Sequence, residues 1–100
     1  MAKQGESKLQ RRIREALEIE FPTSYWFKHH GGPFSRAGMP DLIGCVSGRY
    51  VALEVKRPVG SASRVQRSTI ARLKRAGALT GIVKSPAEAI DFVRRYIDAD

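Results

Sequence analysis

The sequence contains a single cysteine, Cys45, among its 100 residues. One cysteine cannot form a disulfide within the chain, so a disulfide-stapled secreted fold is excluded and a reducing cytoplasm is expected. No stretch approaches the roughly 20 apolar residues of a membrane-spanning helix, and the charged start does not resemble a signal peptide. Acidic residues are also scarce, ten against eighteen Lys and Arg, so the net charge is +8. This imbalance favours a polyanionic partner.

The hydrophobic pattern predicts one α/β domain over residues 1–100, because 42% of the residues are apolar and the chain is too short for a second core. The predicted order is α-β-β-β-α-β-α, with a mixed four-stranded sheet flanked by helices. The last strand should lie parallel to the third, since a helix separates them. Helices are predicted over residues 6–21, 64–76 and 86–97, and strands over 25–30, 42–46, 51–56 and 79–83. Cys45 falls in a strand and is expected to pack in the core.

Two short motifs dominate the sequence, Gly38-Met39-Pro40-Asp41 and Leu53-Glu54-Val55-Lys56. The second motif alternates apolar and polar residues, which predicts a strand with Glu54 and Lys56 on one face. The three-residue link 47–49 contains a glycine and fits a hairpin, which would bring Asp41 back beside Glu54. Two carboxylates suit a hard cation such as Mg²⁺, and a nearby lysine can orient or deprotonate a water.

The two motifs together resemble the PD-(D/E)xK motif of restriction-endonuclease-like nucleases. The matching residues are Pro40-Asp41 and, after a spacer of twelve residues, Glu54-Val55-Lys56. Three further residues, Glu6, Gly38 and Gln66, make the set similar to the VRR-NUC branch, the virus-type replication-repair nucleases. The resemblance runs from about Glu6 to the last helix. It implies a restriction-endonuclease-like core and a metal-dependent endonuclease that hydrolyses phosphodiester bonds.

The resemblance also implies a role for each residue of the site. Asp41 and Glu54 would bind Mg²⁺ or Mn²⁺, with the Val55 carbonyl as an extra ligand. Glu6 would assist through water or a second ion. Lys56 would position the attacking water or neutralise developing charge, and Gln66 would orient Lys56 or a metal-bound water.

Two of these residues have alternative explanations in the sequence itself. Glu6 falls in the first turn of its predicted helix, where a carboxylate is favoured by the helix dipole without any metal. Gln66 and Ser63 have the spacing of a capping box, so Gln66 can be a helix cap. We do not expect one glutamine side chain to serve as cap and site residue at once.

Basic residues cluster after the second motif, where residues 61–80 hold five Lys and Arg and no acids. This helix is the predicted track for DNA phosphates. The candidate DNA contacts are His30, Arg36, Arg57, Arg64 and Arg67. A metal site at His29 and His30 is not expected, because consecutive residues of a strand point to opposite faces.

The predicted substrate is branched DNA, in particular a four-way (Holliday) junction cut by a homodimer. Stand-alone VRR-NUC proteins of phage and bacterial type are associated with that activity, in the cytoplasm of a bacterial or phage-infected cell. The candidate interface is Tyr25-Trp26-Phe27 with Phe34, unless these side chains are buried. The alternatives are a flap endonuclease, a sequence-specific endonuclease, and an inactive DNA-binding module with a nuclease fold.

Overall fold

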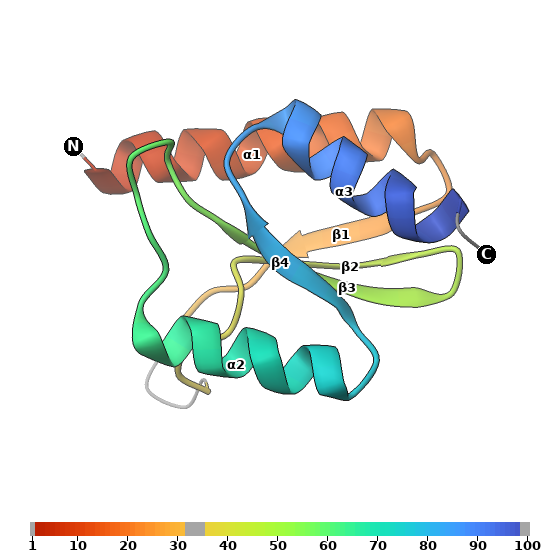
Figure 1. Ribbon diagram of the computed structural model, residues 1–100. Coiled ribbons are helices and arrows are strands. Elements are labelled where there is room, and N and C mark those ends of the chain that lie inside the picture. The colour runs from red at the N-terminus through yellow and green to blue at the C-terminus, as the bar shows by residue number, and fades with distance from the viewer. Residues whose placement is uncertain (1, 32–35, 99–100) are drawn as a thin grey trace.

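The computed structural model describes residues 2–31 and 36–98 (Figure 1). The elements follow in the predicted order: α1 (Ala2–Glu20), β1 (Tyr25–Lys28), β2 (Leu42–Val46), β3 (Arg49–Val55), α2 (Arg64–Arg75), β4 (Leu79–Val83) and α3 (Pro86–Asp98). Among the described residues, no helix is long and apolar enough to cross a membrane.

The four strands form one mixed sheet in the order β1-β2-β3-β4. The first two pairs are antiparallel, and β3 and β4 are parallel, with α2 as the crossover between them. Helices α1 and α3 lie together on one face of the sheet, and α2 lies on the other (Figure 1). The predicted α/β fold with a restriction-endonuclease-like layout is therefore confirmed.

Strand β3 is the centre of the fold, because it is buried from Val51 to Val55. Val51, Leu53 and Val55 alternate along the strand and pack in one core cluster with apolar side chains of α1 and α3. Glu54 lies between them in the sequence and so projects to the opposite face, toward α2. The strand thus holds a fully buried carboxylate in the middle of the molecule.

The hairpin between β2 and β3 is tighter than predicted. Its turn contains only Ser47 and Gly48, whose φ angles of 51° and 79° belong to the left-handed region. Such a turn matches the natural twist of two antiparallel strands, so Arg49 joins β3 and pairs with Val46. The resulting register pairs Leu42 with Leu53 and brings the preceding Asp41 beside Glu54.

Several boundaries differ from the prediction. Helix α1 begins at Ala2, so Glu6 lies in its second turn and the explanation by the helix dipole in a first turn is wrong. Strand β1 ends at Lys28, so His29 and His30 follow the strand. Cys45 is exposed on β2 and does not pack in the core. Phe34 lies outside the described residues.

Candidate functional site

Three carboxylates from three separate elements meet at one end of the sheet. Glu6 comes from α1, Asp41 from the residue before β2, and Glu54 from the second-last position of β3. Ligand oxygens of the three side chains lie within 4.8 Å of one another. The hairpin register accounts for the approach of Asp41 to Glu54, and the packing of α1 on the sheet adds Glu6. Such a set of oxygen ligands suits a hard divalent cation.

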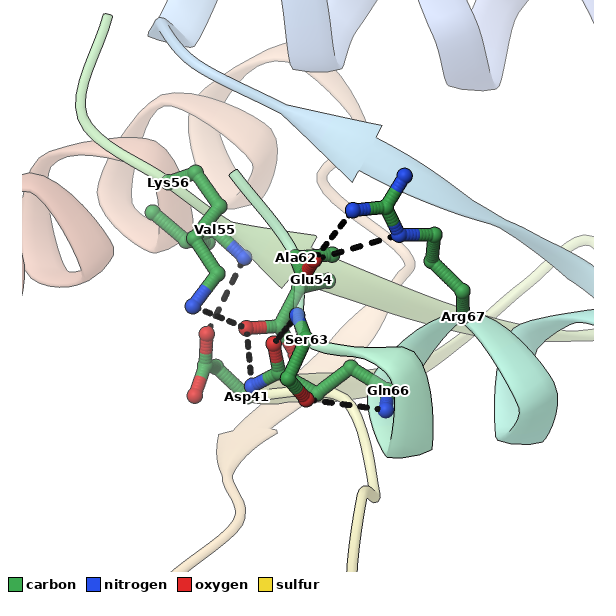
Figure 2. A network of polar contacts seen from close by, with 8 residues as sticks. All are labelled: Asp41, Glu54, Val55, Lys56, Ala62, Ser63, Gln66 and Arg67. Carbon is green, nitrogen blue, oxygen red and sulfur yellow. Dashed lines mark hydrogen bonds and ion pairs between the residues drawn. The ribbon is translucent and has the colours of Figure 1, made fainter. Parts of the chain in front are cut away.

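Glu54 is the most constrained member of the cluster, with 0% of its surface exposed. Its Oε2 accepts a hydrogen bond from Gln66 Nε2 at 2.9 Å and lies 3.3 Å from Lys56 Nζ (Figure 2). Its Oε1 is buried and has no hydrogen-bond partner among the described residues. A buried acceptor left in this state is costly, so the site fits a cation that would bind Oε1.

Burial, and then the neighbouring Asp41 carboxylate, raise the pKa of Glu54 to about 8, against a smaller lowering by Lys56. Two carboxylates at close range disfavour simultaneous ionisation unless a positive charge joins them. Lys56 supplies part of that charge, but burial and Asp41 together outweigh it, so the pKa of Glu54 stays raised. The electrostatics of the cluster therefore agree with the unpartnered Oε1 atom in favouring a bound cation.

The Asp41 backbone and side chain are both held by neighbouring strands. The Val55 N–H donates to Asp41 Oδ2 at 3.0 Å, and the His29 N–H donates to the Asp41 carbonyl at 2.7 Å. Asp41 is thus tied to the end of β3 and to the residue following β1. The Val55 N–H at the end of β3 therefore orients the Asp41 carboxylate.

Gly38 allows the segment before Asp41 to lie against α2. Its φ is +80°, and a Cβ atom at this position would come within 2.6 Å of Val65 Cγ1 and 2.8 Å of Thr69 Oγ1. Only glycine fits both the left-handed backbone and the close approach to the helix. Packing against α2 therefore explains why the first residue of the Gly38-Met39-Pro40-Asp41 motif is a glycine.

Gln66 is both a helix cap and a partner of the carboxylate cluster. Its Oε1 accepts from the Ser63 N–H at 2.9 Å while the Ser63 hydroxyl accepts from the Gln66 N–H, which completes the capping box. Its Nε2 meanwhile donates to Glu54 Oε2 (Figure 2). The expectation that one side chain cannot do both is wrong, because the amide has an acceptor end and a donor end.

Lys56 follows directly after β3, where its N–H donates to the Val83 carbonyl at 3.1 Å. This bond extends the β3–β4 pairing by one residue and fixes where the side chain begins. The ammonium reaches back to Glu54 Oε2, so the amine predicted to share a face with Glu54 does lie beside it. A cation in this position can stabilise negative charge that develops near the carboxylates.

All five predicted DNA contacts, His30, Arg36, Arg57, Arg64 and Arg67, are exposed. Arg67 is different, because its Nε and Nη2 donate to the Ala62 carbonyl at 3.1 and 2.8 Å (Figure 2). That contact holds the chain just before α2, so part of the guanidinium is already committed. Contact with DNA stays a prediction for all five.

Sequence reasoning missed Gln10, which lies one helical turn after Glu6 on the same face of α1. Only 7% of its surface is exposed, and its Oε1 is buried without a hydrogen-bond partner among the described residues. The signal was available in the sequence, because Gln10 stands four residues after Glu6 and three before Ile13, within the apolar stripe of the helix.

No family model matches this sequence. A search of curated proteins likewise gave no significant match. The solved structures that are similar in fold include a "VRR_NUC domain" with a TM-score of 0.69 and 21% identity, covering 87% of this chain and 96% of that one. They also include a "VRR_NUC domain protein" with a TM-score of 0.65 and 19% identity, covering 90% and 88%. The chain therefore has the VRR-NUC fold, as its motifs predicted.

Proposed function

We propose that this chain is a metal-dependent endonuclease that hydrolyses phosphodiester bonds of DNA, with residues 1–100 acting as one domain. The observation that carries the proposal is the cluster of Glu6, Asp41 and Glu54, whose ligand oxygens lie within 4.8 Å of one another beside the Lys56 ammonium. The likeness to two structures named for the VRR_NUC domain supports it.

Asp41 and Glu54 are the proposed ligands of Mg²⁺ or Mn²⁺, with the Val55 carbonyl and Glu6 completing the set. A metal bound there would supply Lewis-acid stabilisation of the phosphate and of the attacking water. The unpartnered Oε1 of Glu54 supports this assignment, because a bound metal would coordinate this buried oxygen. The choice of oxygen ligands favours a hard cation over a softer metal such as Zn²⁺.

The remaining residues orient the reacting groups. The Lys56 ammonium, 3.3 Å from Glu54 Oε2, would hold the attacking water or meet the negative charge on the phosphate. Gln66 fixes the Oε2 end of Glu54 through its amide and leaves Oε1 available. By resemblance, the products would carry 5′-phosphate and 3′-hydroxyl ends.

The proposed substrate is a four-way DNA junction, cut by a homodimer whose two sites match two equivalent strands. The net charge of +8 supports a polyanionic substrate. An apolar hollow of about 300 Å³ on the strands supports an interface, since its lining includes exposed Tyr25, Phe27 and Tyr50. Trp26 is 5% exposed and belongs to the core, so it is removed from the candidate interface.

The test is cleavage of a panel of linear, flapped, gapped and four-way DNAs with Mg²⁺, compared with EDTA. We expect paired symmetric nicks in the four-way junction. Asp41→Ala and Glu54→Ala should abolish cleavage and weaken Mn²⁺ binding, whereas Lys56→Ala should abolish cleavage and largely keep Mn²⁺ binding. Cleavage of flaps alone would refute the substrate, and wild-type cleavage by Glu54→Ala would refute the site.

A further inference from the structure

A groove of about 250 Å³ runs between α1 and the adjacent ends of β1 and β2. Its lining consists of Ser7, Gln10, Arg11, Arg14, Lys28 and Leu42. The groove begins beside the carboxylate cluster, because Glu6 immediately precedes Ser7 and Asp41 immediately precedes Leu42. Its lining includes α1 and no residue of the basic helix α2, which covers the opposite face of the sheet (Figure 1).

The groove has an excess of positive charge. Arg14 is offset by Glu18, one turn further along α1, at 3.2 Å. Arg11 and Lys28 have no ion pair among the described residues, although Glu15 stands one turn from Arg11. Lys28 is half-buried at the end of β1 and lines the groove. Such a lining attracts an anion and disfavours a second metal ion.

Gln10 provides a second, independent observation. It is more than nine-tenths buried, lines the groove, and leaves its Oε1 without a donor among the described residues. An apolar residue would suit this position of the buried stripe better, because an unsatisfied buried amide destabilises the fold. The unpartnered Oε1 therefore needs a hydrogen-bond donor, which an anion cannot supply but a basic side chain of the groove can.

We propose that this groove binds a backbone phosphate of the DNA strand next to the scissile phosphate, an assignment that rests on the proposed function. Arg11 and Lys28 would contact the phosphate oxygens, and Gln10 would be a positioning residue. A phosphate only accepts hydrogen bonds, so it cannot satisfy Gln10 Oε1 directly. The Lys28 ammonium has three N–H groups and can donate to the phosphate and to Gln10 Oε1 together.

The geometry of α1 suits a neighbouring phosphate. Arg11 is five residues beyond Glu6, which corresponds to roughly 7.5 Å along the helix axis. Ser7 and Leu42 of the groove directly follow Glu6 and Asp41 of the cluster, so a strand with one phosphate at the carboxylates can place the next in the groove. Helix α1 would therefore contribute a carboxylate to the chemistry and a contact to substrate placement.

The test measures binding of a fluorescein-labelled four-way junction with Ca²⁺ in place of Mg²⁺. We expect Arg11→Gln and Lys28→Gln each to weaken binding by about three- to tenfold, and the double variant to lower the salt slope by about one, because both cations serve one phosphate. Arg12→Gln is the matched control, since Arg12 has the same charge on the same helix but does not line the groove. An equal loss in Arg12→Gln would overturn the proposal.

Gln10→Leu separates a role in binding from a role in folding. It removes the unpartnered amide, so its melting temperature should equal or exceed that of the wild type while its affinity for the junction falls. Wild-type affinity in a folded Gln10→Leu protein would refute the positioning role.

The proposed chemistry fails independently if the wild type binds the junction but neither cuts it with Mg²⁺ nor binds Mn²⁺ in calorimetry. The groove fails alone if cleavage and Mn²⁺ binding are normal and the Arg11 and Lys28 variants bind like Arg12→Gln. No detectable binding of the junction by the wild type would refute both.

Discussion

Glu54 shows at the scale of one residue why a polar group in the centre of a fold suggests a function. The side chain is fully buried, one of its oxygens is unpartnered, and burial beside Asp41 raises its pKa to about 8. A hydrophobic residue in its place would pack without these penalties. The fold therefore tolerates a locally unfavourable residue, which is common where a ligand later compensates.

The elevated pKa of Glu54 predicts that the metal-free protein loses stability as the pH rises from about 4.5 to about 8. In that interval the folded protein keeps a proton that the unfolded chain has released, so the unfolded state is favoured as protons become scarce. Urea unfolding in EDTA at several pH values measures the effect.

The control for this prediction is Glu54→Gln, which has no titrating group at the position and should show a flatter pH dependence over the same interval. Mg²⁺ added at pH 8 should stabilise the wild type more than the variant, because binding to the folded state adds to stability. Equal pH slopes in the two proteins would contradict the assignment.

Gln66 joins a helix cap to the site, and substitution can separate the two roles. Gln66→Glu keeps an acceptor at the capping position but replaces the N–H donor to Glu54 by a carboxylate oxygen. We expect cleavage to fall by at least about tenfold, since roughly 1.4 kcal/mol of lost orientation gives that factor, with the fold retained.

Ser63→Ala is the complementary variant. It removes the capping hydroxyl and should lower stability by about 1 kcal/mol while leaving the Gln66–Glu54 bond and cleavage below the unfolding temperature intact. Thermal unfolding of both variants measures the capping role, and their single-turnover cleavage measures the role in the site. If Gln66→Glu cut DNA normally, the bond to Glu54 would have no part in the reaction.

At the scale of elements, the site depends on how the segment before β2 rests on α2. Gly38→Ala would place a Cβ atom 2.6 Å from Val65 Cγ1 in a backbone with φ of +80°. We expect a loss of about 1–3 kcal/mol in stability and weaker Mn²⁺ binding, because relief of the clash must move the segment that carries Asp41.

Gly48→Ala is a matched control for this substitution. Gly48 has nearly the same φ of +79°, but a Cβ atom there would meet nothing within 4 Å. It should therefore show the cost of the left-handed backbone alone and leave Mn²⁺ affinity unchanged. Equal effects of the two substitutions in urea unfolding and in calorimetry would rule out the contact with α2 as the cause.

At the scale of the whole molecule, the sheet is covered unevenly. Tyr25 and Phe27 are 72% and 47% exposed on the edge strand β1, beside exposed Tyr50 of β3. Exposed aromatic side chains gathered in one hollow are typical of an interaction surface. In the proposed function this surface joins two copies of the chain.

The double variant Tyr25→Ser, Phe27→Ser should therefore be monomeric at a concentration at which the wild type sediments as a dimer. Its stability as a monomer should change little, because both side chains are already exposed. Val59→Ser is the control, since Val59 is 94% exposed on the loop after β3 and lies outside the hollow. A monomeric wild type, or a dimeric double variant, would contradict the interface.

Sequence alone determined the order of the elements, the parallel pairing of the last two strands and the approach of Asp41 to Glu54. These features follow from short-range physics, namely the alternation of apolar residues, the turn residues and the register that a hairpin imposes. The motifs Pro40-Asp41 and Glu54-Val55-Lys56 lie within one hairpin, so their meeting needs no knowledge of distant packing.

Only the tertiary structure decided what depends on contacts between distant elements. The packing of α1 on the sheet places Glu6 within 4.8 Å of the other two carboxylates and buries Gln10. The position of α2 against the sheet lets Gln66 cap its helix and donate a hydrogen bond to Glu54 at the same time. These outcomes depend on where whole helices rest, because helix positions follow from the summed packing of many side chains and not from the local sequence around any one of them.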